Sequence, residues 1–191
     1  MLTIEEKIVA DIPCFEIAEA DEEPLAELLL YHGWGSNAEK QRFRGQLLAA
    51  FGYRVIVPEI PGHGVRGALA YDGPQAALDF QRVLLQSIGE CEELAQAVFH
   101  PGRAHFLVGH SLGGMIALGA LTPLARALNG VVAMNSRRTG QMPQRRWRAF
   151  FATVARRLQC WLLTRAKSCG RHSMHLIRRG GLRAGSRRRC S

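Results

Sequence analysis

Acidic residues are missing from the last third of this sequence. Residues 136–191 contain no Asp or Glu but hold 16 of the 25 Lys and Arg residues, and 15 of those 16 are arginine. Residues 1–135 hold all 16 acidic residues and 9 basic ones, so the net charge changes from −7 to +16 along the chain. We therefore expect an ordered acidic body over 1–135 and a basic tail over 136–191 whose unpaired charge opposes compaction.

Long apolar runs and paired cysteines are also absent. The sequence has no stretch of about 18 apolar residues that could cross a membrane. The segment Met1–Lys7 is charged and lacks the apolar centre of a secretory signal. The five cysteines form no C-x-x-C pair, as expected of reduced thiols in a cytosolic protein. At 191 residues, the length suits one domain with a sizeable core.

What the sequence does have is an apolar strand that leads directly into a G-x-S-x-G motif. Residues 105–114 read HFLVGHSLGG, and good helix formers follow over 115–121. This pattern is typical of a nucleophile elbow, in which a serine sits on a strained turn between strand and helix. Gly109 and Gly113 fit that geometry, because the backbones that flank the serine nearly touch. The motif predicts Ser111 as a nucleophile.

A second apolar strand ends in a glycine-rich loop. Residues 28–31 read LLLY, and residues 32–35 read HGWG. In enzymes built around such an elbow, the loop after this strand donates one backbone N–H to the oxyanion and the residue after the nucleophile donates the other. Those donors would be Trp34 and Leu112, although a plain glycine-rich turn is the alternative interpretation of HGWG. Together the two motifs predict acyl-transfer chemistry.

These motifs carry a family resemblance. The run from Leu28 to Asn135 resembles the small bacterial α/β-hydrolases of the prolyl-oligopeptidase-like and dienelactone-hydrolase-like esterase group. The matching segments are LLLYHGWGSNAEKQRFRGQLLAAFGYRVIVPEIPGHGVRG, ALDFQRVLLQSI, FLVGHSLGGMIALGAL and GVVAMNS, which cover over half the chain. The resemblance implies a cytoplasmic serine hydrolase that cleaves small carboxylic esters or related acyl compounds without metal or cofactor. It does not identify the substrate.

The hydrophobic pattern agrees with that fold. Strands are predicted over 8–17, 25–31, 54–58, 105–108 and 130–134, and helices over 37–51, 74–89 and 115–121. A capping box from Ser36 to Glu39 is expected to start the first helix, and Gly89 is expected to end the second. The alternation predicts a doubly wound, mostly parallel α/β sheet of the α/β-hydrolase type. The sheet is expected to stop after 130–134, which would leave an exposed edge strand where the family places two more strands.

The expected catalytic triad is incomplete. In this family its members follow the chain order Ser, Asp or Glu, His, but no carboxylate follows Ser111. Only His172 and His175 follow the serine, in a segment without the strand-then-loop pattern of the usual base. Packing or loop roles are expected for the five earlier histidines, His32, His63, His100, His105 and His110. We therefore expect this chain to be inactive or impaired.

Three interpretations of the basic tail remain open. A frameshift in GC-rich DNA between codons 135 and 145 would convert Asp, Glu and Ala codons into arginine codons. A genuine arm would make the chain a non-catalytic binding protein for nucleic acid or anionic membrane, through runs such as 187–189 or an amphipathic helix over 145–167. A divergent family member is the third interpretation. A zinc site is disfavoured by ligand spacing and by nearby arginines; the candidate ligands are Cys169, His172, His175 and Cys190.

Overall fold

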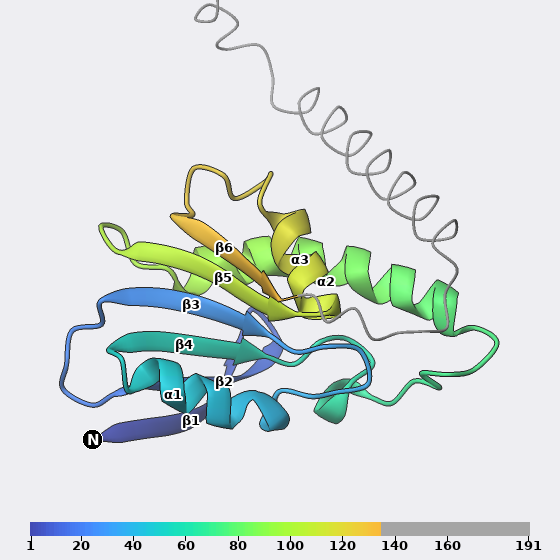
Figure 1. Ribbon diagram of the computed structural model, residues 1–191, viewed down its shortest axis with the longest axis horizontal. Coiled ribbons are helices and arrows are strands. Elements are labelled where there is room, and N and C mark those ends of the chain that lie inside the picture. The colour runs from blue at the N-terminus through green and yellow to red at the C-terminus, as the bar shows by residue number, and fades with distance from the viewer. Residues whose placement is uncertain (135–191) are drawn as a thin grey trace, which may run out of the picture. The chain divides into compact units, whose positions relative to one another are not determined.

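The computed structural model describes residues 1–134 of the chain. In chain order the elements are β1 (Leu2–Val9), β2 (Ile12–Glu19), β3 (Ala26–Tyr31), the 3₁₀ turn η1 (Glu39–Gln41), α1 (Arg42–Ala49), β4 (Tyr53–Pro58), the 3₁₀ turn η2 (Gly64–Arg66), α2 (Ala76–Val98), β5 (Ala104–His110), α3 (Leu112–Ala120) and β6 (Gly130–Met134). Strands and helices alternate from β3 onward, as the hydrophobic pattern predicts (Figure 1).

The six strands of the described residues form one mixed sheet in the order β1-β2-β4-β3-β5-β6. The hairpin of β1 and β2 is antiparallel, and β2 also pairs antiparallel with β4. The pairs β3 with β4, β3 with β5 and β5 with β6 are all parallel. The prediction of a mostly parallel α/β-hydrolase sheet is therefore confirmed. Among these strands, β6 lies at the edge opposite β1 (Figure 1).

The order of the strands determines which face each helix covers. The connection from β3 through α1 leads to β4 on one side, whereas the connections through α2 and α3 lead in the opposite direction, to β5 and then β6. Because parallel crossovers are right-handed, α1 covers one face of the sheet and α2 and α3 cover the other. Figure 1 shows α2 and α3 side by side, and Gly119 of α3 packs against Ile88 of α2.

The central strands β3 and β4 are mostly apolar because both of their faces are buried, apart from Glu27 and Arg54 near their starts. All six residues of β3 and the last four of β4 are buried. Val55 and Val57 pack in one cluster with Ala49 of α1. Ile56 lies between these two valines in β4 and so points to the opposite face, on the side of α2 and α3. This core fixes the ends of the strands, where the candidate site lies.

The first helix begins later than predicted, and the expected capping box is not formed. The prediction placed a helix over 37–51, but η1 and then α1 occupy only part of that range, and no side-chain cap bonds precede either element. The Oδ1 of Asn37 accepts from the Lys40 N–H at 3.0 Å instead. The Ser36 N–H donates to a carbonyl of the preceding loop, so this serine belongs to a turn and not to a helix terminus. The side chain of Asn37 therefore makes a local bond to the backbone at this point, where a serine cap was predicted.

The second helix does not end at Gly89, as predicted, but continues through it to Val98. Gly89 lies on the exposed side of α2, where an added Cβ would meet no atom within 4 Å. Ile88, Cys91 and Leu94 are buried on the other side and hold the helix against the sheet. A glycine in a helix interior costs about 1 kcal/mol relative to alanine, which this apolar burial outweighs.

The predicted basic tail lies outside the described residues. This holds for the amphipathic helix predicted over 145–167, for His172 and His175, and for the disfavoured zinc ligands. These predictions therefore stay predictions.

Candidate active site

The G-x-S-x-G segment forms the sharp turn between β5 and α3. Ser111 has φ 55° and ψ −114°, a backbone conformation that residues other than glycine rarely adopt. Its N–H donates to the Met134 carbonyl of β6 at 2.8 Å, and its carbonyl accepts from the Met115 N–H of α3 at 3.1 Å. The strained residue is therefore held from both sides, and its side chain is only partly buried.

Two glycines allow this turn to form. An added Cβ on Gly109 would lie 2.6 Å from the backbone nitrogen of Gly114, and one on Gly113 would lie 2.6 Å from the carbonyl oxygen of His32. Both distances are below 3.0 Å, which real Cβ atoms essentially never show. The backbones beside Ser111 therefore approach as closely as the motif predicts, and only hydrogen fits at either position.

The glycine-rich loop after β3 packs against the turn. β3 and β5 are parallel neighbours, so their carboxyl ends lie side by side. An added Cβ on Gly33 would lie 3.5 Å from the Ser111 Cβ and 3.3 Å from the His110 carbonyl oxygen. The structure thus brings Ser111, the loop that contains Trp34, and Leu112 together at one edge of the sheet.

The backbone at Leu112 and the loop around Trp34 have features that oxyanion donors require. Leu112 is the buried first residue of α3, where a backbone N–H has no partner within the helix and the helix dipole favours negative charge. Trp34 is partly buried, and its indole N–H donates to the Tyr71 carbonyl at 3.2 Å. That bond holds the side chain without using the backbone N–H.

Two buried histidines support the glycine-rich loop, in keeping with the packing or loop roles predicted for them, but the sequence did not indicate which groups they join. The His63 Nε2 accepts from the Gly35 N–H at 3.1 Å, and the His63 Nδ1 lies 2.9 Å from the Pro61 carbonyl oxygen. The His32 Nε2 lies 2.8 Å from a carboxylate oxygen of Glu59, in the loop after β4. Each histidine sits beside glycine in a loop that directly follows an apolar strand, which is the signal that could have singled them out.

Aromatic rings surround one of these histidines. Trp34 meets His63 edge to face with ring centroids 5.1 Å apart, and Tyr71 stacks on His63 at 4.9 Å. Trp34 also meets Tyr71 and Phe80 edge to face, at 5.2 Å in each case. Such aromatic contacts contribute about 0.5–1.5 kcal/mol each beyond burial. They hold the loop after β3 against the segment between β4 and α2.

Within residues 1–134, no histidine or carboxylate hydrogen bonds to the Ser111 side chain. His110 is the last residue of β5, directly before Ser111. The other described histidines bond to other groups; these are His32, His63, His100 and His105. In this part of the chain, the strained serine is therefore present without a base bonded to its hydroxyl.

No helix within residues 1–134 is both long enough and apolar enough to span a membrane. No group of three or more His, Cys, Asp and Glu side chains there is arranged to hold a metal ion.

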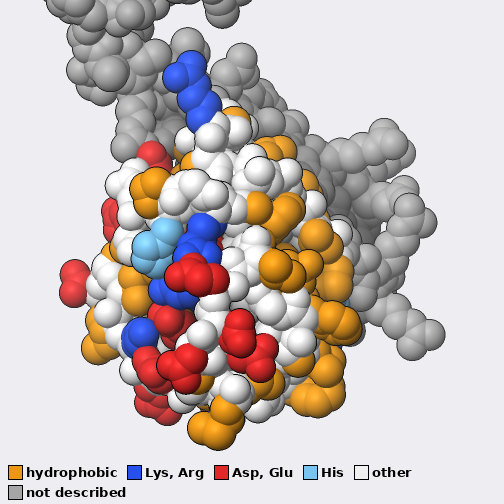
Figure 2. Space-filling view, turned by 90° about the vertical axis from the view of Figure 1, so that its left-hand side faces the viewer, with side chains coloured by type: hydrophobic (Ala, Val, Ile, Leu, Met, Phe, Trp, Pro, Cys, Tyr) orange, Lys and Arg blue, Asp and Glu red, His pale blue; other side chains and the backbone are white. Residues whose placement is uncertain are grey.

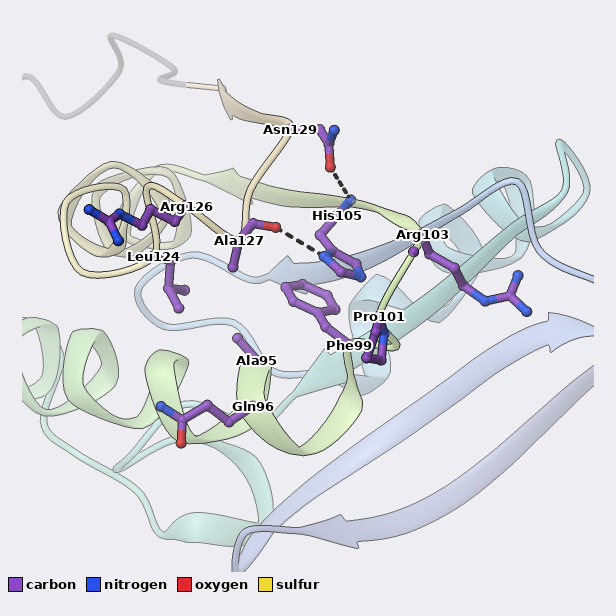
Figure 3. A pocket seen from close by; sticks show the side chains of 11 residues that line it. Ala95, Gln96, Phe99, Pro101, Arg103, His105, Leu124, Arg126, Ala127 and Asn129 are labelled. Atoms are coloured by element: carbon purple, nitrogen blue, oxygen red, sulfur yellow. Dashed lines mark hydrogen bonds between the residues drawn. The ribbon is translucent and has the colours of Figure 1, made fainter.

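A hollow of about 430 Å³ lies at the opposite end of β5, about 20 Å from Ser111 by the length of that strand. Figure 3 shows His105 in its wall, stacked on Phe99, with one ring nitrogen bonded to the Ala127 carbonyl.

On the side of the molecule that Figure 2 presents, acidic and basic side chains lie close together. The buried Glu27 of β3 forms an ion pair with Arg54 of β4, near the start of both strands. None of these groups can reach the elbow.

Comparisons with known proteins agree with this geometry. The model of the alpha/beta hydrolase family matches residues 28–185, which include both motifs and extend into the acid-free segment. Esterase YjfP of Escherichia coli is 33% identical over 129 residues, which make up 62% of this chain and 49% of that protein. The pimeloyl-(acyl-carrier protein) methyl ester esterase of Edwardsiella ictaluri is 35% identical over 112 residues, 58% of this chain and 36% of that protein.

The solved structure of TT1662 from Thermus thermophilus has a similar fold. It superposes with a TM-score of 0.62 at 25% identity, over 75% of this chain and 61% of that one. The chain spans about half the length of the Escherichia coli relative and less of the Edwardsiella one.

Proposed function

This chain belongs to the alpha/beta hydrolase family, and from that premise we propose that its elbow is the nucleophile site of a carboxylic ester hydrolase. The observation that carries the proposal is the strained Ser111, held between β5 and α3 with the loop after β3 packed against it. Two curated relatives are named as esterases, which supports ester chemistry. The substrate is a small acyl ester, and the reaction requires neither metal nor organic cofactor.

The proposed reaction is acyl transfer in two steps. The Ser111 Oγ attacks the acyl carbon of the ester, and the carbonyl oxygen becomes an oxyanion that accepts from the backbone N–H groups of Trp34 and Leu112. Collapse of this intermediate expels the alcohol and leaves an acyl-serine ester. Water then attacks the acyl group through a second oxyanion, which releases the carboxylic acid and regenerates the serine hydroxyl.

Both steps need a base to take a proton from the attacking hydroxyl, and this is where the chain departs from its family. No carboxylate follows Ser111 in the sequence, and the histidines that follow it are His172 and His175, outside the described residues. We infer that turnover is impaired. Loss of triad members leaves about a 10³- to 10⁴-fold acceleration over water, from the oxyanion hole and binding alone.

Added imidazole tests this proposal on the chain as it exists. If only the base is missing, free imidazole can deprotonate Ser111, and hydrolysis of p-nitrophenyl acetate should rise with imidazole above the rate of the Ser111→Ala variant. That variant is the control for hydrolysis by imidazole itself. Equal rates in both proteins at every imidazole concentration would refute the proposed site.

The sequence motifs suggest a more specific position for this chain within the family. We propose that the chain derives from the prolyl-oligopeptidase-like and dienelactone-hydrolase-like esterases, and that residues 1–135 are an incomplete hydrolase body. The arginine-rich composition of 136–191 supports a frameshift as the origin of the tail, whereas the family match reaches residue 185. The coding DNA decides: a shift near codon 140 should restore an Asp and a His in hydrolase-like context.

A second candidate function rests on the charge of the tail. With 16 basic residues and no acid, the segment 136–191 could bind nucleic acid or anionic membrane without catalysis. Tight binding of the full chain to a DNA duplex or to anionic vesicles, weakening steeply with salt, would support this alternative. Absence of binding to both at low salt would exclude it.

A further inference from the structure

The loop after β4 is joined to the glycine-rich loop after β3 by a buried imidazole. The His63 ring is fully buried and contacts one backbone group on each side, the Pro61 carbonyl and the Gly35 N–H. A neutral imidazole has one N–H donor and one bare nitrogen acceptor. These two partners therefore require the tautomer with its hydrogen on Nδ1, which donates to Pro61, and a bare Nε2, which accepts from Gly35.

The surroundings of this ring favour its neutral form. Burial lowers the pKa of His63 from its ordinary value of 6.5, and the neighbouring His32 lowers it further. The Pro61 carbonyl and the Glu59 carboxylate act in the opposite direction but do not cancel the effect of burial. Among the described residues, the ring of Tyr71 also faces the imidazole and stacks on it.

The bond from Gly35 bears on the proposed oxyanion donor because of its place in the chain. Gly35 has φ +70°, so this loop turns sharply directly after Trp34. The backbone nitrogen of Gly35 belongs to the peptide unit that joins it to Trp34, and that unit is planar. Fixing the Gly35 N–H on His63 therefore fixes one side of Trp34, while the ring contacts fix its side chain.

We propose that His63 is a positioning residue, which as neutral imidazole holds the Trp34–Gly35 peptide and so fixes the carboxyl side of Trp34, the residue whose backbone N–H we propose as an oxyanion donor. The inference rests on the proposed function for its catalytic consequence, but its geometric content stands on the contacts alone. Protonation of His63 would place a second N–H against the Gly35 N–H and release the loop.

Nuclear magnetic resonance on the full chain tests the geometry without any activity. In ¹⁵N-histidine-labelled protein near neutral pH, His63 should show the tautomer protonated on Nδ1, and the Gly35 amide should exchange slowly with solvent. In His63→Phe the acceptor is lost, and this amide should exchange about ten-fold faster. In His63→Gln, where the side-chain oxygen can accept, the protection should persist. His100→Phe, at the other end of the sheet, is the matched control.

Kinetics then test the catalytic consequence. In the imidazole-assisted assay, His63→Phe should lower the Ser111-dependent kcat about 100-fold with little change in KM, as for loss of one oxyanion donor. His63→Gln should recover most of kcat and, with the concentration of neutral imidazole held constant, should lose less activity than wild type as the pH falls. An Nε2–H tautomer, or Gly35 exchange unchanged in His63→Phe, would overturn the positioning role. Hydrolysis equal to that of Ser111→Ala in wild type would instead refute the proposed function, and the tautomer and exchange results would still decide the geometry.

Discussion

Three glycines of this chain provide a matched test of the elbow. Gly109 and Gly113 flank Ser111 at positions where an added methyl group would overlap backbone, whereas Gly89 lies in α2 where a methyl group would meet nothing within 4 Å. The same chemical change, glycine to alanine, is therefore predicted to act in opposite directions at these sites. The elbow substitutions should destabilise the fold, and the substitution in α2 should stabilise it.

The magnitudes follow from the contacts. At Gly113 the new Cβ would lie 2.6 Å from the His32 carbonyl oxygen, and at Gly109 it would lie 2.6 Å from the Gly114 nitrogen. These are backbone atoms, which cannot rotate away as a flexible side chain can. Overpacking of this kind typically lowers the free energy of unfolding by about 1–3 kcal/mol, and we expect the upper end here because backbone atoms are involved. At Gly89, alanine should raise it by about 1 kcal/mol through helix propensity.

Urea denaturation followed by circular dichroism measures the effect, with the m-value checked for constancy. Gly113→Ala is the more demanding test, because Gly113 lies in α3 and helix propensity alone would make alanine stabilising there. If Gly109→Ala and Gly113→Ala unfold at the same urea concentration as wild type, the close backbone approach is not present in solution. The strained-elbow argument would then fail.

Three further predictions concern single residues. Ser111→Gly should raise the free energy of unfolding by about 1 kcal/mol, because glycine adopts φ 55° without strain; a decrease in urea denaturation would show that the serine backbone is relaxed. Because the pKa of His63 is lowered in the folded protein, its side chain is neutral in both the folded and the unfolded state above pH 6.5. Below pH 6.5, the unfolded state binds a proton at this residue before the folded state does. Stability should therefore fall from pH 6.5 downward more steeply in wild type than in His63→Gln, and parallel profiles would contradict the burial of a neutral ring. Burial raises the pKa of Cys14 to about 12 and that of Cys91 to about 11, so neither thiol should react with iodoacetamide at pH 8 in the native protein, as peptide mass spectrometry can measure.

The parts of the site that could be predicted from sequence depend on local patterns. An apolar run, two glycines at fixed spacing and a following helix suffice to place Ser111 on a turn, and the parallel pairing of β3 with β5 brings the HGWG loop to it. The link between His63 and Gly35 could not be predicted in the same way. It joins two loops 28 residues apart, and no periodicity reports which loop folds over which.

The errors in the helices have a similar origin. A helix start depends on which side chain reaches the free backbone N–H groups, and here Asn37 does so although Ser36 has the better-known motif. Gly89 is a stop signal in isolation, but burial of Ile88 and Cys91 on the far side of the helix overrides it. Tertiary contacts decide both cases, and single-sequence propensities do not contain them.

Contacts among the described residues hold the strained backbone of Ser111. Met134 of β6 accepts its N–H, Gly113 packs against the carbonyl end of β3, and Gly109 packs against α3. None of these contacts involves a triad acid or base, so the geometry of the nucleophile does not depend on the groups that would activate it. A chain without those groups should therefore still hold a formed nucleophile site, which is why added imidazole can test catalysis and the glycine substitutions can test the site independently. If Gly109→Ala destabilises the fold as expected while imidazole produces no Ser111-dependent hydrolysis, the elbow exists but its chemistry is not ester hydrolysis. If both results are positive, the missing base alone separates this chain from an active hydrolase.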